Sequence, residues 1–147
     1  MANLLRLGIL GVVVIGGIVA FVFRDRLSTD AQDTRVGDCI EVPTAGEFTS
    51  LQHRPCTEPH DGEVYYEANY PDQDTLPTTA QFDTFFEREC LAARFQAYTG
   101  LTYQQAAGID AMYFSPTADS WPHGDREIVC ILVPATGGKI SQSYRKG

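Results

Sequence analysis

The hydrophobic pattern of the chain consists of one uninterrupted apolar run and a longer region of short alternating segments. Residues 7–23 read LGILGVVVIGGIVAFVF and contain no charged side chain. As a helix this run would be about 25 Å long at ~1.5 Å per residue, close to the ~30 Å hydrocarbon core of a bilayer. Arg6, Arg24 and Arg26 flank the run and can reach the two membrane interfaces. Residues 1–26 are therefore predicted to contain a cytoplasmic start and one transmembrane helix.

A cleaved secretory signal is the alternative for this run, because such signals also combine a basic start with an apolar stretch. The run ends in the bulky Phe21-Val22-Phe23 instead of the small residues of a cleavage site. The pattern therefore favours an uncleaved signal anchor. Within it, Gly16 and Ala20 lie four residues apart and would let a second helix approach closely.

The region beyond the run predicts a polar tether followed by several strands. Residues 27–35 lack hydrophobic periodicity and would span at most about 30 Å when fully extended. Alternating or β-branched segments then predict strands. These strands are expected over residues 36–43, 48–54, 63–70, 112–114 and 127–133, with a marginal edge strand over 140–144. Residues 127–133, EIVCILV, are expected to form a central strand.

One long helix is predicted between the third and fourth of these strands. Thr78 or Thr79 can cap its start, and Gly100 is suited to end it. Its expected core stripe is Phe82, Phe86, Cys90, Ala93 and Ala97, widened by Phe85, Leu91, Phe95 and Tyr98. A further short helix is expected over 102–107. Residues 36–147 are thus predicted to form one α+β domain with a mainly antiparallel sheet packed on one long helix.

Charge and cysteine usage place this domain outside the cytoplasm. The chain carries a net charge of −8, and residues 1–26 contribute +2, so the remainder carries −10. Such an acidic domain argues against nucleic acid as a partner and against docking on an anionic lipid surface. The four cysteines all follow the apolar run, and their even number predicts two disulfides in an oxidising compartment. The N-terminus is therefore expected in the cytoplasm and residues 27–147 outside the cell membrane.

The candidate chemistry of the chain is sparse. His53, Cys56 and His60 have a spacing like that of zinc ligands, but the expected compartment favours disulfides, so no metal is predicted. His60 is a possible general base. No nucleophile motif or phosphate-binding glycine loop accompanies it in the sequence. No catalytic residue and no cofactor are predicted, and His60 is expected to hold its loop by hydrogen bonds.

Acidic and aromatic side chains offer two further interpretations. Glu58, Asp61, Glu63 and Glu67 are expected to lie on a solvated loop and strand face. Tyr65, Tyr66, Tyr70 and Trp121 suit either a glycan-stacking platform with weak glycan contact or the domain core. A core role is favoured because a small domain needs its aromatic side chains inside.

Four segments together resemble a known family. They are VGDC at 36–39, PCTEPHDGEV at 55–64, a one-cysteine helix ending in YTG at 98–100, and YFSPTADSWPHGDREIVCILV at 113–133. In this order they resemble the septum-formation domain of actinobacterial membrane and envelope proteins, over about residues 36–143. The C-terminus departs from that pattern, because relatives often end in a Gly-Ser-rich stretch and this chain ends in SQSYRKG.

The resemblance implies a link to cell division without an established biochemical activity. Its motif residues, for which structural roles are expected, are Gly37, Asp38, Pro59, His60, Glu63, Trp121, Gly124, Asp125 and Arg126. Gly124 is expected to adopt a positive φ. Asp125 and Arg126 are expected to pair with their surroundings or to hold the loop at 59–62.

The positions of the cysteines favour one of the three possible disulfide pairings. Cys39 and Cys56 flank a predicted hairpin, whereas Cys90 and Cys130 would join the helix to the central strand. In the chain-entropy estimate these two cross-links would stabilise the fold by roughly 3 and 4 kcal/mol.

These observations support three hypotheses about function. The first is a non-enzymatic, single-span accessory protein whose exported domain binds envelope or membrane proteins, with a link to septum formation. The second is a small accessory subunit of another membrane complex, such as a respiratory assembly. The third is an envelope enzyme or glycan-binding module.

Overall fold

The computed structural model describes residues 29–30, 33–43 and 50–147. The predicted transmembrane run, with Gly16 and Ala20, lies outside these residues. None of the helices within the described ranges is long and apolar enough to cross a bilayer.

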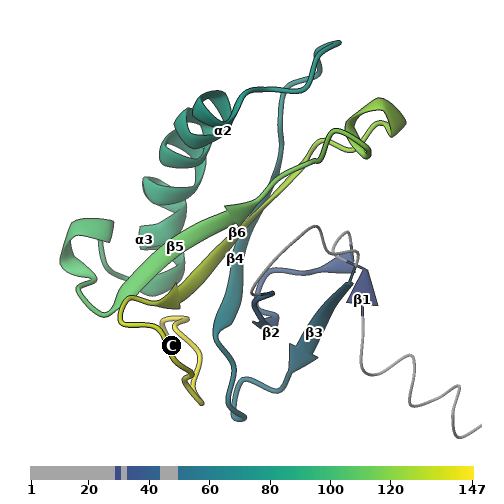
Figure 1. The fold of residues 1–147 in the computed structure, drawn as a ribbon. Coiled ribbons are helices and arrows are strands. Elements are labelled where there is room, and N and C mark those ends of the chain that lie inside the picture. Colours follow the sequence, from purple (N-terminus) through teal and green to yellow (C-terminus); the bar gives the residue numbers. More distant parts are fainter. Residues whose placement is uncertain (1–28, 31–32, 44–49) are drawn as a thin grey trace, which may run out of the picture.

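Six antiparallel strands form the sheet of the domain (Figure 1). They are β1 (Thr29–Asp30), β2 (Cys39–Glu41), β3 (Ser50–Arg54), β4 (Gly62–Asn69), β5 (Ile109–Phe114) and β6 (Glu127–Pro134). Their order is β1-β3-β2-β4-β6-β5, and every pairing is antiparallel, as predicted. Strand β6 is internal, which confirms the expected central strand. Strand β1 lies within the predicted tether.

The marginal strand predicted at 140–144 does not form. Ile140 instead makes a single bridge with His60, in which each backbone N–H donates to the carbonyl of the other residue. Residues after Ile140 form a segment without regular structure that bonds to Glu63 near the start of β4 and to Tyr98 on α3 (Figure 1).

The helical layer packs on one side of β4, β6 and β5 (Figure 1). It comprises α2 (Thr79–Phe86), the π-helical turn η2 (Glu87–Leu91) and α3 (Ala93–Thr99). Thr78 caps α2 in a capping box with Gln81, and Gly100 ends α3 with φ of 79°. Both predicted helix boundaries are therefore confirmed. Short 3₁₀ turns follow as η3 (Tyr103–Gln105) and η4 (Trp121–His123).

The prediction of one long helix is wrong, because η2 and a non-helical Ala92 (ψ of −117°) separate α2 from α3. A π turn inserts one residue per turn and rotates the following side chains. The buried stripe consequently passes from Cys90 to Phe95, five residues later, and on to Tyr98. Ala93 and Ala97, which were expected in the core, are exposed.

Apolar side chains fill both faces of the sheet, and the alternation along β6 shows how. Ile128, Cys130 and Leu132 pack toward the helices with Phe95 and other aromatic residues. Val129 and Ile131 pack on the opposite face with residues of β2 and β3. A strand that is covered on both sides needs an uninterrupted apolar sequence, as EIVCILV provides.

Two disulfides cross-link the domain in the predicted pairing. Cys39–Cys56 joins β2 to the loop after β3, and Cys90–Cys130 joins η2 to β6. No cysteine of the chain is free.

Candidate functional site

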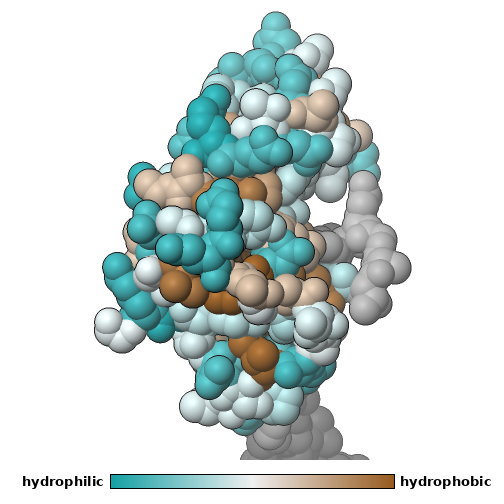
Figure 2. Space-filling model, turned by 90° about the vertical axis from the view of Figure 1, so that its left-hand side faces the viewer, coloured by the Kyte–Doolittle hydropathy of each residue, from teal (hydrophilic) through white to brown (hydrophobic). Residues whose placement is uncertain are grey.

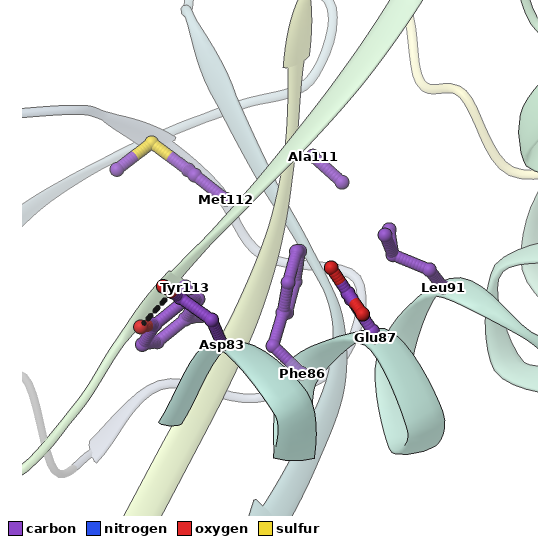
Figure 3. Close-up of a pocket in the computed structure, with 7 residues that line it drawn as sticks. All are labelled: Asp83, Phe86, Glu87, Leu91, Ala111, Met112 and Tyr113. Carbon is purple, nitrogen blue, oxygen red and sulfur yellow. Dashed lines mark hydrogen bonds between the residues drawn. The ribbon is translucent and has the colours of Figure 1, made fainter. Parts of the chain in front are cut away.

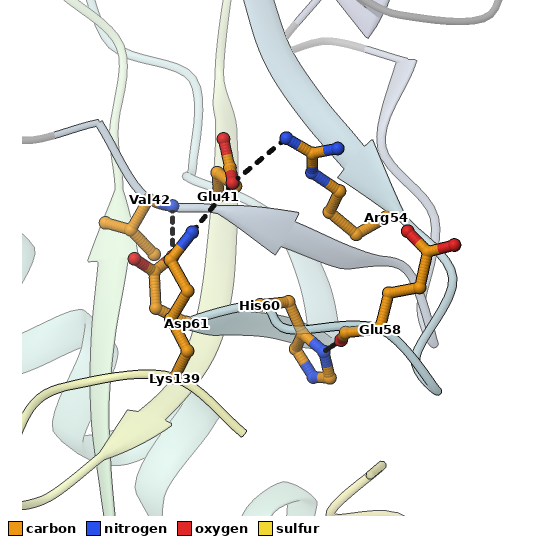
Figure 4. Close-up of polar contacts among 7 residues, drawn as sticks. All are labelled: Glu41, Val42, Arg54, Glu58, His60, Asp61 and Lys139. Carbon is orange, nitrogen blue, oxygen red and sulfur yellow. Dashed lines mark hydrogen bonds and ion pairs between the residues drawn. The ribbon is translucent and has the colours of Figure 1, made fainter. Parts of the chain in front are cut away.

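The motif around His60 forms a hydrogen-bonded junction where β2, β4 and the C-terminal segment meet (Figure 4). His60 is fully buried, and its Nδ1 lies 2.8 Å from the carbonyl oxygen of Glu58. The neighbouring Asp61 accepts a hydrogen bond of 2.6 Å from the backbone N–H of Val42. With the bridge to Ile140, these contacts fix the 59–62 loop from three sides.

A small ionic network covers this junction. Glu41 accepts hydrogen bonds from Lys139 Nζ at 2.7 Å and from Arg54 Nη2 at 3.1 Å (Figure 4). The bond from Lys139, together with the charge of Arg54, lowers the pKa of Glu41. All three side chains are partly exposed, so the network contributes little to stability.

Glu63 lies inside the protein, which contradicts the expectation of a solvated carboxylate. Its side chain is fully buried. Oε1 accepts hydrogen bonds from Tyr98 Oη at 2.6 Å and Ser143 Oγ at 2.5 Å, and Oε2 accepts one from the Tyr144 N–H at 2.7 Å. Glu63 therefore attaches the C-terminal segment to α3 and β4. The sequence did contain a signal for this buried position. Glu63 precedes Tyr65 by two residues, and strand residues i and i+2 share a face, so an inward Tyr65 implies an inward Glu63.

The residues present do not make the zinc site considered from the sequence. His53 pairs with Asp38, its Nδ1 lying 3.4 Å from Asp38 Oδ2, and it does not join Cys56 and His60 in a cluster. Within the described ranges, Cys39, His60 and Glu63 do place one potential ligand atom each within 4.8 Å of one another. The Cys39 sulfur is bonded to Cys56, so the set lacks the thiolate that zinc prefers.

The second motif, WPHGDR at 121–126, lies at the opposite end of the central strands. Arg126 places its guanidinium 3.6 Å from the ring centroid of Trp121 and pairs with Asp72 at 2.9 Å. Strand β4, eight residues and thus about 25 Å long, separates this corner from His60. Of the two alternatives expected for Arg126, pairing with its surroundings is therefore observed, and holding the 59–62 loop is not. Gly124 adopts the predicted positive φ, at 91°.

The four aromatic residues considered for a glycan platform are divided between separate places. Tyr65 and Trp121 are buried, at 3% exposure each, so neither presents a ring face to solvent. Tyr65 packs edge-on against Phe95, whereas Tyr70 packs against Trp121 at the other end of β4.

An acidic group lies beside the Trp121 corner. Burial, reinforced by Glu67, Asp125 and Asp33, raises the pKa of Glu127 to about 7. Burial also raises the pKa of Glu67, although this carboxyl accepts a hydrogen bond from Thr34. Glu127 is therefore a carboxyl that titrates near neutral pH.

The structure contains a groove that the sequence pattern did not predict (Figure 3). It has a volume of about 420 Å³ between the helices and β5, and its lining is Asp83, Phe86, Glu87, Leu91, Ala111, Met112 and Tyr113. Tyr113 donates a hydrogen bond of 2.7 Å to Asp83 across one end. Burial and this bond raise the pKa of Tyr113, which favours its neutral form. Figure 2, which views the helical side of the molecule, shows apolar residues reaching the surface in separate patches among hydrophilic ones.

Strand β5 forms one edge of the sheet beside this groove. It pairs with β6 alone in the part of the chain that the structure describes. An edge strand presents N–H and C=O groups that an added strand can use. The groove therefore lies beside a strand edge that pairs with no further strand in the described ranges, although the Ala111 N–H already donates to Asp110 Oδ1 at 2.8 Å. It combines this edge with an apolar pocket and two carboxylates.

Comparison with known proteins identifies the family of this chain. No curated protein and no solved structure matches it. The sequence model of the family described as septum formation matches residues 20–145, and the chain therefore belongs to this family.

Proposed function

We propose that this protein is a non-enzymatic accessory protein of the cell envelope that binds a protein partner during septum formation. The family description supports the link to cell division. Residues 7–23 would hold the domain at the membrane, because their length and lack of charge suit a bilayer span.

The observation that carries partner binding is the groove along β5. An extended segment of a partner would pair with the outer edge of β5, replacing Asp110 Oδ1 as the acceptor of the Ala111 N–H, and place an apolar side chain against Phe86 and Leu91. This is the geometry of β-strand addition, in which main-chain bonds give affinity and side-chain pockets give specificity. Asp83 and Glu87 at the groove favour a segment that also carries Lys or Arg.

The placement of the motif residues supports a structural role over a catalytic one. His60 and Glu63 are fully buried, and both are hydrogen-bonded to the C-terminal part of the chain. The backbone of His60 bonds to Ile140, and the carboxylate of Glu63 accepts hydrogen bonds from Ser143 and Tyr144. Arg126 lies against Trp121 and Asp72 at the far end of the sheet. These groups thus hold separate parts of the fold together.

Co-purification from membranes tests the proposal. The full chain, solubilised in mild detergent, is recovered as wild type, as Leu91→Glu in the groove and as Leu101→Glu. Leu101 is 41% exposed and does not line the groove, so it controls for the added charge. Because Leu91 packs against the core cluster, the thermal midpoint of each variant is measured to show that it still folds. We expect Leu91→Glu to lose division proteins that wild type and Leu101→Glu retain.

The identity of the recovered proteins separates the competing functions. Respiratory subunits in place of division proteins would support the accessory-subunit hypothesis, and equal recovery by both Leu variants would refute binding in the groove. A complementation assay adds an independent test. Loss of activity in His60→Ala with an unchanged thermal midpoint would support an enzyme.

Membrane anchoring is tested separately. A reporter that is active only in the cytoplasm, fused after Gly147, should remain silent in the intact chain. A strong signal would contradict the proposed placement of the domain outside the membrane.

A further inference from the structure

A second cleft lies where β4, α3 and the C-terminal segment meet. Its volume is about 360 Å³, and its lining includes Tyr65, Tyr66, Arg94, Tyr98, Arg145 and Lys146. No residue is shared with the groove along β5. Neither the family motifs nor the proposed partner groove accounts for this concentration of basic and aromatic side chains.

The cations of this cleft differ from most others of the domain because they make no ion pair within the described ranges. Arg54, Arg88, Arg126 and Lys139 each lie within 4.0 Å of a carboxylate oxygen. Arg94, Arg145 and Lys146 are exposed and have no such partner there, and Arg35 is the other unpaired cation. In a domain with an excess of acidic residues, unpaired positive charge thus gathers at one cleft.

Tyrosine rings position the two guanidinium groups. Arg94 lies 4.6 Å from the ring centroid of Tyr66, and Arg145 lies 5.5 Å from that of Tyr98. A guanidinium that stacks on a ring keeps its N–H edge available for a carboxylate. Burial, and then the hydrogen bond to Glu63, raise the pKa of Tyr98, so its phenol does not neutralise the cations.

Backbone hydrogen bonds hold the segment that carries Arg145 and Lys146. The Tyr144 N–H donates to Glu63 Oε2 at 2.7 Å, and the Lys146 N–H donates to the carbonyl of Tyr98 at 2.9 Å. The stem of Lys146 lies beside Gly100, at the end of α3. The cleft is therefore formed before any ligand arrives, which lowers the entropy lost on binding.

We propose that this cleft binds a short acidic peptide segment in an extended conformation. Arg94 and Gly100, beside which Lys146 lies, are six helical positions apart, or about 9 Å along α3. Carboxylates on alternate residues of an extended peptide are about 7 Å apart. A row of two or three acidic side chains consequently fits the spread of cations better than one compact anion does.

The overall charge argues for a peptide over a polyanionic surface. Residues 27–147 carry a net charge of −10, which repels an anionic membrane or polymer as a whole. A short peptide with few carboxylates interacts mainly with protein charges within about 8 Å, the screening length at physiological salt. In the cleft the nearby charges include the cations that line it. The tyrosine rings would pack against the apolar stems of its glutamates.

Binding of a synthetic peptide tests this assignment. The probe is fluorescein-labelled Glu-Gly-Glu-Gly-Glu with blocked ends, titrated into the full chain in mild detergent. We expect saturable binding that weakens with added salt, and about tenfold weaker binding for Arg94→Gln and for Arg145→Gln. Arg88→Gln is the matched control, because Arg88 lies outside the cleft and pairs with Glu89. It should bind as wild type does.

Two further ligands test whether the cleft prefers a peptide to other anionic molecules. Inorganic phosphate and vesicles containing phosphatidylglycerol are tested on the same proteins. Binding of either one without the peptide would overturn the proposal, as would peptide binding that Arg94→Gln leaves unchanged. The Arg94 side chain makes no hydrogen bond or ion pair within the described ranges and only stacks on Tyr66, so its variant should fold normally; this is checked by its thermal midpoint. Because the groove along β5 shares no residue with the cleft, Leu91→Glu should leave peptide binding unchanged.

Discussion

Replacement of Glu63 by Met and by Gln separates its hydrogen bonding from its volume. Both substitutes fill the side-chain space, but methionine removes the acceptors of three hydrogen bonds. Glutamine can direct its carbonyl oxygen to the Tyr144 N–H and its NH₂ group to the hydroxyls of Tyr98 and Ser143, which can also accept. Met is therefore expected to be the more damaging substitute.

The magnitudes follow from the burial of the three donors. The Tyr98 hydroxyl is buried, so leaving it unsatisfied costs about 1–3 kcal/mol. The donors of Ser143 and Tyr144 are partly buried and regain water when the segment separates, so they add about 1 kcal/mol together. We expect Glu63→Met to lower the free energy of unfolding by about 2–4 kcal/mol and Glu63→Gln by about 1–2 kcal/mol.

Denaturant unfolding and amide exchange provide the measurements. Urea titration of the full chain in detergent gives the difference in stability between the two variants. Hydrogen exchange at the Tyr144 and Lys146 amides reports whether the C-terminal segment has separated, and it should accelerate in Glu63→Met. If the two variants are equally stable and both amides stay protected, Glu63 does not hold this segment.

Three other predictions concern the packing, the cross-links and the titration of the domain. Gly62→Ala would place a methyl carbon 2.6 Å from Val42 Cγ2 and should cost about 1–3 kcal/mol in urea unfolding, whereas Gly108→Ala, with open space around it, should cost little. Cys130→Ser removes a cross-link across 40 residues and should destabilise by about 2–5 kcal/mol; peptide mapping without reductant should recover the Cys90-containing peptide unlinked. Because the folded-state pKa of Glu127 is raised to about 7, its contribution to stability is present below pH ~4.5 and is lost as the pH rises through 7. Glu127→Gln should therefore be more stable than wild type at pH 8, by about 1–2 kcal/mol, and the difference should vanish near pH 4; a pH-independent difference would contradict this origin.

Local sequence signals predicted most strands and both ends of the helical layer. Thr78 and Gly100 have conformational preferences that act within one helical turn. Their roles as the two helix caps could therefore be predicted from the sequence alone. The apolar, β-branched sequence of residues 127–133 indicated a central strand. The inward position of Cys90 on its helix and of Cys130 on its strand likewise favoured the observed disulfide.

The interruption of the helix depends on packing between distant elements. A regular helix that points Cys90 inward would turn Phe95 partly away from the sheet, whereas the π turn brings both to zero exposure. The five-residue spacing between them was visible in the sequence. Regular helical spacing instead puts Ala93 and Ala97 at the centre of the predicted stripe and Phe95 at its margin, although two alanines contribute far less apolar area than one phenylalanine.

Neither the groove along β5 nor the basic cleft could be predicted from the sequence, because each is lined by segments that are far apart in the chain. The groove along β5 needs α2 to lie beside a strand some 25 residues later, and the basic cleft needs the C-terminal segment to meet the end of α3. Hydrophobic periodicity indicates which face of an element is buried. It does not state which elements meet at the surface.

The C-terminal segment connects the family motif to the basic cleft. The sequence SQSYRKG supplies two donors to Glu63 as well as two cations of the cleft. Glu63 does not line the cleft, yet its bond to Tyr144 fixes the backbone immediately before Arg145. Loss of that bond in Glu63→Met should therefore weaken binding of the acidic peptide through these two cations, while the contribution of Arg94 on α3 persists. A cleft formed without the C-terminal segment would lose nothing in this variant, so peptide affinity measured in Glu63→Met tests whether the motif glutamate positions a binding surface as well as a fold.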